Sequence, residues 1–244
     1  MRYWFLLVLL GGALAWGGTR WRAHSDDVWE RIAPGVEMRT LRAPGDGSAR
    51  SIVALRTSPD RIRVAMGAAR EAEAWRKTFK ALAAVNGGYY DAEGKPLGLR
   101  ASRGQKLSPL HGKAWGVFYT RSDEKSPKAR IVATEKFKWR SNIRVALQCG
   151  PRLVENGKVL KLKPQWARRT GLGIQRDGRV IIAVADSEIS LTDWAKLWAS
   201  PSGLNCPDAL NLDGGPSSQL SLQTASRQLH LRSGRAVPDT VLIK

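Results

Sequence analysis

The alternation of apolar and polar residues predicts short β-strands over the first third of the chain. Segments 36–41, 51–58 and 61–67 are rich in apolar and β-branched residues and are separated by Pro, Gly and Asp turns. The period then changes over 68–84, where apolar residues recur at helical spacing. We therefore expect a β-rich start followed by a helix that packs on the sheet.

The second half of the sequence is typical of β-hairpins. Asn-Gly at 156–157 and Asp-Gly at 177–178 each stand between apolar runs, which predicts two tight hairpin turns. The run 180–185 is continuously apolar and is expected to be a strand buried on both faces. Ser190 is a candidate N-cap for a helix over 190–200. Further strands are expected at 96–104, 115–120, 129–134, 227–233 and 240–244, the last two as a pair.

These elements predict one α+β domain over residues 24–244, with a mixed, mainly antiparallel β-sheet core and a few packed helices. The chain has 244 residues, and 43% of them are hydrophobic, which is enough for a sizeable core. No repeat period and no linker divides the sequence.

Residues 1–23 are typical of a targeting segment. Arg2 precedes an apolar run over 3–18, and the small-x-small sequence at 13–15 is a cleavage site that signal peptidase accepts. The run is about 16 residues long, shorter than the roughly 20 that span a bilayer. We therefore expect either a cleaved signal peptide or an uncleaved N-terminal anchor with membrane association, and a periplasmic or secreted location for the remainder.

The charge of the chain points to anionic partners. Forty Lys and Arg against 21 Asp and Glu give a formal charge of +19. In an exported protein this charge favours a phosphorylated glycan or another anionic envelope polymer over nucleic acid, and no nucleic-acid-binding motif is present. The basic residues are scattered, so a solvated basic surface is the simpler interpretation, and binding to nucleic acid or to a membrane surface is a third alternative.

Cysteine and histidine usage limits the chemistry. Cys149 and Cys206 are the only cysteines, and in an oxidising compartment they predict one disulfide bridge. Three histidines leave little material for a metal centre or a Ser/His/Asp triad. We expect neither a metal nor another cofactor.

Two stretches predict a polar site at strand ends. If 209–213 is an extended strand, Asn211 and Asp213 lie on one face, and Leu210 and Leu212 lie on the other. Two glycines and two serines follow, and the stretch from Asn86 repeats the pattern of an apolar run that ends in Asn-Gly-Gly. Such sequences also form ordinary turns. The candidate binding residues are Asn86, Gly87, Gly88, Asn211, Gly214, Gly215, Ser217 and Ser218.

Five segments in order carry a family resemblance. They are "VNGGYYD", "PLGL", "CGPRLVENGKV", "RRTGLGIQRDGRVIIAVAD" and "DALNLDGGPSSQL". Together they resemble the phosphodiester glycosidase family, from about residue 51 to the C-terminus. Many bacterial members are associated with exopolysaccharide biosynthesis. The resemblance implies a hydrolase that cleaves a sugar-1-phosphodiester at the anomeric carbon.

The resemblance implies roles for individual residues. Asp213 is the first candidate for the catalytic carboxylate, as nucleophile, base or electrostatic stabiliser, and Asp186 is the candidate second carboxylate. Arg169, with Thr170 beside it, is the candidate phosphate clamp, because a guanidinium binds phosphate in a bidentate manner. Arg152 is a second candidate clamp.

The sequence departs from the usual family pattern in two places. Pro216 stands where a third glycine is usual and lacks a backbone N–H. Ser187 and Glu188 stand where Gly-Arg is usual. An alternative function is therefore that of a non-catalytic glycan-binding or scaffold protein of polysaccharide biosynthesis or export that retains the fold.

Overall fold

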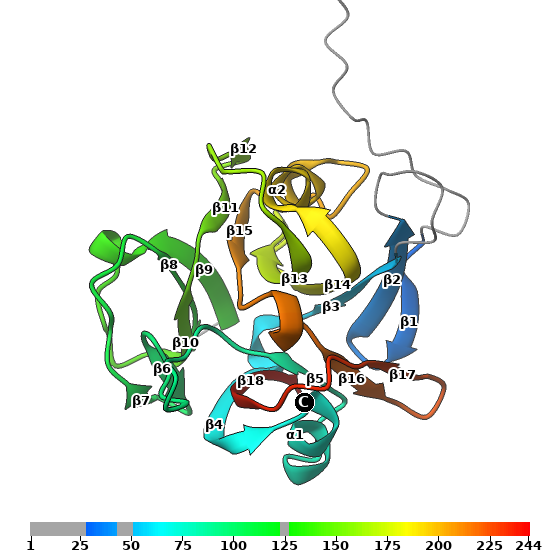
Figure 1. Ribbon diagram of the computed structural model, residues 1–244, viewed down its shortest axis with the longest axis horizontal. Coiled ribbons are helices and arrows are strands. Elements are labelled where there is room, and N and C mark those ends of the chain that lie inside the picture. Colours follow the sequence, from blue (N-terminus) through cyan, green and yellow to red (C-terminus); the bar gives the residue numbers. More distant parts are fainter. Residues whose placement is uncertain (1–27, 43–50, 123–126) are drawn as a thin grey trace, which may run out of the picture.

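The described residues of the protein fold into three antiparallel sheets (Figure 1). The structure is a computed structural model that describes residues 28–42, 51–122 and 127–244. The expected targeting segment at 1–23 lies outside the described residues. Within the described ranges, every pairing between strands is antiparallel, and neither α-helix is long and apolar enough to cross a membrane.

The largest sheet has eight strands in the order β1-β2-β3-β14-β13-β15-β11-β12. Their bounds are β1 Glu30–Ala33, β2 Val36–Arg42, β3 Ser51–Thr57, β11 Arg152–Glu155, β12 Lys158–Val159, β13 Trp166–Ile174, β14 Val180–Ser190 and β15 Asp208–Asn211. Strand β14 occupies a central place between β3 and β13, and it is buried on both sides as its apolar run predicted.

Two five-stranded sheets complete the β structure. One has the order β7-β6-β10-β8-β9 and the other β17-β16-β5-β18-β4. Their bounds are β6 Arg100–Ser102, β7 Gln105–Ser108, β8 Gly116–Ser122, β9 Pro127–Ala133 and β10 Ile143–Cys149, then β4 Ile62–Arg70, β5 Ala83–Asn86, β16 Leu220–Gln223, β17 Gln228–Leu231 and β18 Val237–Ile243.

Helices cover the outer faces of two sheets. Helix α2 (Leu191–Ala199) packs on the eight-stranded sheet, and α1 (Ala72–Thr78) packs on the sheet that contains β5. In Figure 1 they lie above and below the two sheets. Three short 3-10 turns are also present: η1 Pro59–Arg61, η2 Thr134–Lys136 and η3 Gly215–Ser217. The described chain is thus β-rich with two α-helices, and the expected α+β class holds only in part.

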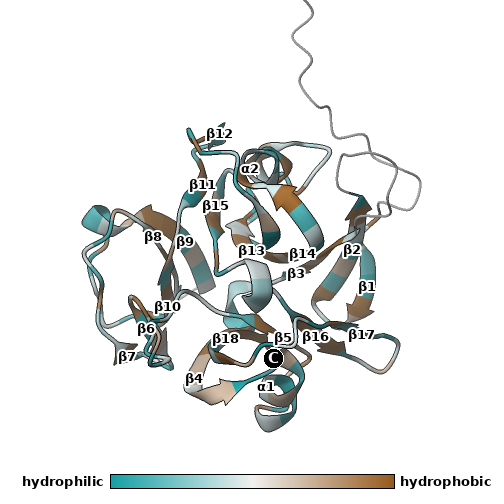
Figure 2. Cartoon of the chain, in the orientation of Figure 1, coloured by the Kyte–Doolittle hydropathy of each residue, from teal (hydrophilic) through white to brown (hydrophobic). Residues whose placement is uncertain are grey.

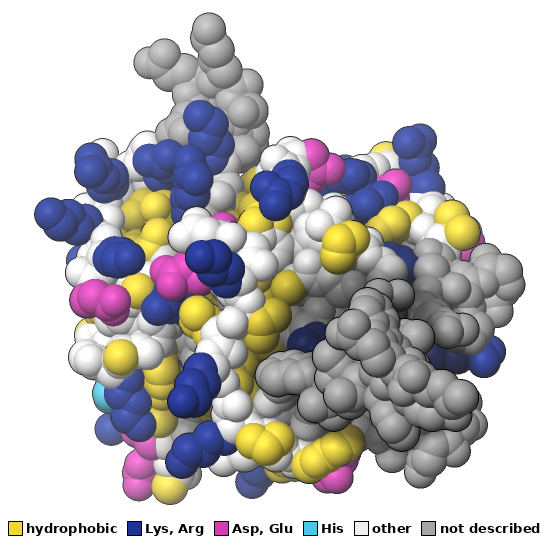
Figure 3. Space-filling model, turned by 90° about the horizontal axis from the view of Figure 1, so that it is seen from above, with side chains coloured by type: hydrophobic (Ala, Val, Ile, Leu, Met, Phe, Trp, Pro, Cys, Tyr) yellow, Lys and Arg dark blue, Asp and Glu magenta, His cyan; other side chains and the backbone are white. Residues whose placement is uncertain are grey.

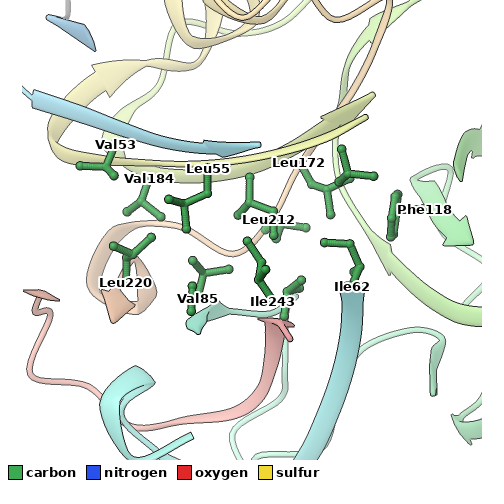
Figure 4. Packing of buried hydrophobic residues seen from close by; sticks show 14 of the residues in the cluster. Val53, Leu55, Ile62, Val85, Phe118, Leu172, Val184, Leu212, Leu220 and Ile243 are labelled. Atoms are coloured by element: carbon green, nitrogen blue, oxygen red, sulfur yellow. The ribbon is translucent and has the colours of Figure 1, made fainter. Parts of the chain in front are cut away.

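The main core lies between the sheets. Figure 4 shows Val53, Leu55 and Val184 of the eight-stranded sheet opposite Val85 and Ile243 of the β5 sheet. Alternate residues of β14 enter this core, and those between them pack against α2, because successive side chains of a strand point to opposite faces. Figure 2 shows the same distribution, with hydrophobic residues in the central strands and hydrophilic residues in many outer loops.

Local predictions from capping and turns are confirmed. Both hairpin turns are present, between β11 and β12 and between β13 and β14. Ser190 is the N-cap of α2, and its Oγ accepts a hydrogen bond from the N–H of Asp193. Trp194 and Trp198 are fully buried on the inner face of α2.

Three predicted elements differ in the structure. The helix expected over 68–84 covers only Ala72–Thr78, because Lys80 adopts a left-handed conformation (φ 48°) and the following residues form β5. The expected strand over 96–104 contains only the three residues of β6. The strands expected at 227–233 and 240–244 lie in one sheet but do not pair, since β16 and β5 separate β17 from β18.

The predicted disulfide is wrong in this structure. Cys149 and Cys206 are both free and buried. Cys149 belongs to the core between the sheets, whereas Cys206 belongs to the cluster beneath α2, so the thiols lie in different hydrophobic clusters. Burial raises the pKa of Cys149 to about 12 and raises that of Cys206 well above its ordinary value. Both thiols therefore behave as small buried apolar groups.

We expect both cysteines to be unreactive in the folded protein and reactive after unfolding. Alkylation without reductant, followed by mass spectrometry, should label neither thiol in native buffer and both in denaturant. The melting temperature should not change when reductant is added. Recovery of a peptide that links Cys149 to Cys206 would contradict this arrangement.

Candidate active site

The two Asn-Gly-Gly-like junctions of the sequence meet in space. The Asn86 side-chain Nδ2 donates to the backbone oxygen of Asp213 at 2.8 Å, and the Asp213 N–H donates to the oxygen of Gly87 at 3.2 Å. Asn86 ends β5, and Asp213 follows β15 in a different sheet. The junction therefore joins two sheets, and η3 beyond it lies at the centre of the view in Figure 1.

Thr170 completes the connection from β13. Its hydroxyl donates to Asn86 Oδ1 at 2.7 Å, and its backbone oxygen accepts from the N–H of Leu212 at 2.9 Å. Gln219 N–H also donates to Asn86 Oδ1, at 3.3 Å. Because Asn86 and Thr170 are buried and their polar side-chain atoms are engaged within the protein, they orient the backbone around Asp213.

Asp213 is a half-buried carboxylate at this junction. The two leucines of the alternating pattern, Leu210 and Leu212, were predicted to share one face, and both belong to the main core. Burial raises the pKa of the Asp213 carboxyl, while hydrogen bonds from the Ser217 hydroxyl and from Gly214 N–H act in the opposite direction. The Gly214 N–H lies 2.9 Å from Asp213 Oδ1. A carboxylate in this setting is suited to nucleophilic, base or electrostatic work.

Arg169 supplies a buried positive charge next to the same turn. It is 7% exposed, and its Nη1 lies 3.9 Å from the position that a Cβ on Gly214 would occupy. Its Nη2 donates to the oxygen of Gln165, but Nε has no partner and no carboxylate forms an ion pair with it among the described residues. Burial lowers the pKa of Arg169, and the charge of Glu188 acts against that change. A buried guanidinium without a paired carboxylate fits an anionic ligand.

Two further buried polar atoms lie around the junction. Asn211 Nδ2 donates to the oxygens of Leu212 (2.6 Å) and Gly150 (3.4 Å), but Asn211 Oδ1 has no partner within the described part of the chain. The same holds for the hydroxyl of Ser218. Buried polar atoms are normally paired, so these two are candidates to bind a ligand or an ordered water.

The two tyrosines after Gly88 serve mainly in packing. The Tyr89 hydroxyl donates to Gly150 O at 2.8 Å, its ring packs against Trp115, and burial raises its pKa. The Tyr90 hydroxyl lies 3.4 Å from Ser217 Oγ. Tyr90 thus reaches the serine that hydrogen-bonds the Asp213 carboxylate.

The glycines after Asp213 have separate structural reasons. A Cβ on Gly214 would lie 2.9 Å from the backbone oxygen of Arg168, so this position requires the close approach of two backbone segments. Gly215 has a φ of +57°, which favours glycine. Pro216 lies in the first turn of η3, where a missing N–H leaves no intrahelical bond unmade.

Two sequence candidates lie apart from this group. Asp186, the candidate second carboxylate, lies within β14, which continues to Ser190. It is exposed and pairs with Arg168 Nη2 at 3.0 Å. Arg152 pairs with Glu155 at 2.5 Å. Neither makes a hydrogen bond or ion pair to Asp213 or Arg169 in the described structure.

An ion pair that the sequence analysis missed supports the first junction. Arg100 on β6 and Asp239 on β18 are both fully buried and form an ion pair. Arg100 Nη2 also donates to Tyr89 O at 3.1 Å, and Gly87 N–H donates to Asp239 O at 3.1 Å. The two residues are 139 positions apart, and no local pattern marks either of them.

This ion pair explains the two glycines that follow Asn86. A Cβ on Gly87 would lie 2.3 Å from Asp239 Oδ1, and a Cβ on Gly88 would lie 2.4 Å from Arg100 Nη2. Both distances are well below van der Waals contact. The glycines therefore let the loop lie directly on a buried ion pair, which holds it against Asp213.

The described residues contain no group of three or more His, Cys, Asp or Glu side chains placed to hold a metal ion. The functional groups gathered here are a carboxylate, a guanidinium, an amide oxygen and two hydroxyls. They suit recognition of an anionic, hydroxyl-rich ligand.

Sequence comparison identifies the class to which this fold and site belong. The profile of the phosphodiester glycosidase family matches residues 79–244. The chain belongs to the phosphodiester glycosidase family. It is also 33% identical over 144 residues to the uncharacterized protein YigE of Escherichia coli, a match that covers 54% of each chain, so the aligned region spans about half the length of that relative.

Solved structures share the fold. The catalytic domain of zebrafish N-acetylglucosamine-1-phosphodiester alpha-N-acetylglucosaminidase, auto-inhibited by its pro-peptide, is similar with a TM-score of 0.70 and 20% identity, over 91% of this chain and 86% of that one. A hypothetical protein from Synechocystis is similar with a TM-score of 0.62 and 13% identity, over 86% and 62% of the two chains. A putative exported protein from Burkholderia pseudomallei is similar with a TM-score of 0.58 and 14% identity, over 80% and 74%.

We expect Gly88→Ala to destabilise the protein by about 1–3 kcal/mol, because the added methyl group overlaps Arg100. Gly112→Ala is the matched control, since a Cβ there meets no atom within 4 Å and should change the free energy of unfolding by less than about 0.5 kcal/mol. Chemical denaturation measures both. Equal stabilities for the two variants would contradict the close packing of the loop on the ion pair.

Proposed function

We propose that this protein is an exported hydrolase that cleaves a sugar-1-phosphodiester linkage in an envelope or extracellular glycan. Family membership supports a glycosidase-type activity. The observation that carries the proposal is that two groups lie at Gly214. The half-buried carboxylate of Asp213 accepts from the Gly214 N–H, and the buried guanidinium of Arg169, which pairs with no carboxylate among the described residues, lies 3.9 Å from the position of a Gly214 Cβ. From two segments of the chain the site thus offers a group for the anomeric carbon and a group for the phosphate.

The proposed reaction divides these roles. Arg169 binds the phosphate of the substrate, and Asp213 acts on or beside the anomeric carbon as positive charge develops there. The bond between the anomeric carbon and the phosphate oxygen breaks, and the electron pair leaves with the phosphate. Water supplies the hydroxyl of the free sugar and the proton of the phosphomonoester product. A phosphate is a good leaving group, so this reaction has little need for a strong general acid.

Ser217 and Asn211 have supporting roles in this proposal. The Ser217 hydroxyl hydrogen-bonds the Asp213 carboxylate and favours its ionised form. Asn211 Oδ1 and the Ser218 hydroxyl, which lack partners among the described residues, are available to sugar or phosphate groups. Glu188 places a negative charge near Arg169, and this charge favours a substrate different from that of family members with Gly-Arg at the same place.

The basic character of the chain agrees with an anionic glycan as the substrate. Lys and Arg side chains are spread over the face in Figure 3, with few Asp and Glu between them. A dispersed positive charge raises the local concentration of an anionic polymer without defining one binding geometry.

We expect Asp213→Asn to lower kcat by about 100- to 10,000-fold without unfolding the protein. The assay is release of free sugar and phosphomonoester from a panel of sugar-1-phosphodiesters, including the α-N-acetylglucosaminyl compound. Asp208→Asn is the control, because Asp208 is also on β15 but accepts a hydrogen bond from the N–H of Asn156 at the other end of the strand. It should retain wild-type kcat.

The same variants separate the hydrolase from the alternative of a non-catalytic glycan-binding protein. A binding protein would release no sugar in any form, and Asp213→Asn would leave its affinity for the glycan intact. Equal turnover by wild type and by folded Asp213→Asn would exclude Asp213 as the catalytic carboxylate.

The pH dependence should report the ionisation of Asp213. Its carboxyl must be ionised to act as nucleophile, base or stabiliser, and burial raises its pKa above the ordinary 3.8. We therefore expect kcat/KM to rise with pH along an acidic limb centred above pH 3.8. In Ser217→Ala the limb should move to higher pH, because the hydrogen bond that favours the ionised form is lost. A limb that stays in place would assign it to another group.

A further inference from the structure

A second basic site lies away from the candidate active site. A cavity of about 340 Å³ opens between η1 with β4 on one side and the β6–β7 turn, β8 and β10 on the other. Four arginines and one carboxylate line it: Arg63, Arg103, Arg121, Arg144 and Asp60. The other lining residues are uncharged. Strand β10 runs from this cavity to the candidate site. Arg144, near its start, lines the cavity, and Cys149, at its end, precedes Gly150 of the candidate site. Five residues, or roughly 16 Å of extended strand, separate Arg144 from Cys149.

The excess of positive charge distinguishes this cavity. Its lining residues have a formal charge of +3. The lining residues of three other cavities in the described part of the chain have formal charges of +1, 0 and −1. A strongly basic chain alone does not explain the difference, because all four cavities belong to the same chain. The guanidinium groups of Arg63, Arg103 and Arg144 repel one another in this cavity, and a bound anion would offset that repulsion.

Irregular backbone brings two of these arginines to the cavity. Ile143 pairs with Arg121 and Val145 pairs with Thr120, so Arg144 is the extra residue of a β-bulge in β10. Arg103 stands in the β6–β7 turn with a φ of 52°, a conformation that an arginine rarely adopts. The N–H of Gly104 donates to Arg144 O at 2.9 Å and fixes the turn against the bulge.

A third arginine is held at the rim by backbone oxygens. Arg63 Nη1 donates to Asp60 O at 2.5 Å and to Ile62 O at 2.8 Å. These bonds keep the guanidinium at the edge of the cavity instead of extended into solvent. Thr120, which is buried, also lines the wall. Guanidinium groups dominate the lining, and they are usual partners of a phosphate or sulfate group.

We propose that the arginine cavity at Arg63, Arg103, Arg121 and Arg144 binds an oxyanion, a phosphate or sulfate group, independently of the site at Asp213. Both a soluble phosphorylated sugar and a phospholipid headgroup carry this chemistry. The cavity would hold one anionic group of a larger ligand while another part of that ligand reaches a different surface of the protein. This site goes beyond the proposed hydrolase activity and does not depend on it.

An NMR titration of the full chain with inorganic phosphate tests the proposal. The backbone amides of Arg103, Gly104 and Arg144 should shift and saturate, separately from any change at Gly214. In the double variant Arg103→Gln and Arg144→Gln, the Kd reported by the Gly104 amide should rise by at least about tenfold, a loss of about 1.4 kcal/mol. Both arginines are exposed, so these changes should not unfold the protein.

A matched double variant controls for the loss of two charges. Arg140→Gln with Arg176→Gln removes two exposed arginines that do not line the cavity, and the Kd at Gly104 should change by less than about twofold. No saturable shift at Gly104 in wild type would overturn the proposal. An equal loss of affinity in both double variants would also overturn it, because binding would then follow net charge alone.

Two further arms identify the source of the oxyanion. Glucose 6-phosphate in place of inorganic phosphate should shift the same amides if the ligand is a soluble phosphorylated sugar. Co-sedimentation with phosphatidylglycerol vesicles, but not with phosphatidylcholine vesicles, should be lost in Arg103→Gln with Arg144→Gln if the ligand is a lipid headgroup. Hydrolysis of a small substrate at the Asp213 site should be unchanged in this double variant, which separates this proposal from the proposed function.

Discussion

The buried side-chain amide of Asn86 is the interaction on which the candidate site depends. Its Nδ2 holds the backbone of Asp213, and its Oδ1 accepts from Thr170 and from the N–H of Gln219. Strands β5, β13 and β15 come from two sheets, and this one amide joins the end of β5 to the middle of β13 and to the turn that follows β15. A buried amide is costly to leave unpaired, so each bond constrains the others and the carboxylate of Asp213 is placed by the whole network.

The buried ion pair of Arg100 and Asp239 imposes a second constraint on the same loop. Arg100 donates a hydrogen bond to the backbone oxygen of Tyr89, and the atoms of the ion pair occupy the space where side chains at Gly87 and Gly88 would lie. Breaking a buried ion pair leaves an uncompensated charge, which is strongly unfavourable. The ion pair therefore explains the two glycines of the Asn-Gly-Gly sequence, and the hydrogen bond to Asp213 explains its asparagine. The turn after Asp213 is explained by its contact with Arg168 O.

Charge is used in two ways in this molecule. Arg100 is buried with a carboxylate, whereas Arg169 is buried without one among the described residues. The first arrangement is complete within the protein and serves the fold. The second leaves positive charge next to Gly214, an arrangement that fits an anionic ligand. Most other Lys and Arg residues in the described part of the chain are exposed, and they affect solubility and attraction at a distance more than geometry.

The sequence by itself determined the local elements and the part of the site that holds Asn211 and Asp213. The turns at 156–157 and 177–178, the doubly buried run of β14 and the cap of α2 follow from interactions between near neighbours. The strand-end position of Asn211 and Asp213 and the family also follow from it. Only tertiary structure decided the order of strands, the separation of Cys149 from Cys206, and the pairing of Arg100 with Asp239. These depend on which distant segments share buried space, and alternation along one segment carries no information about its partner.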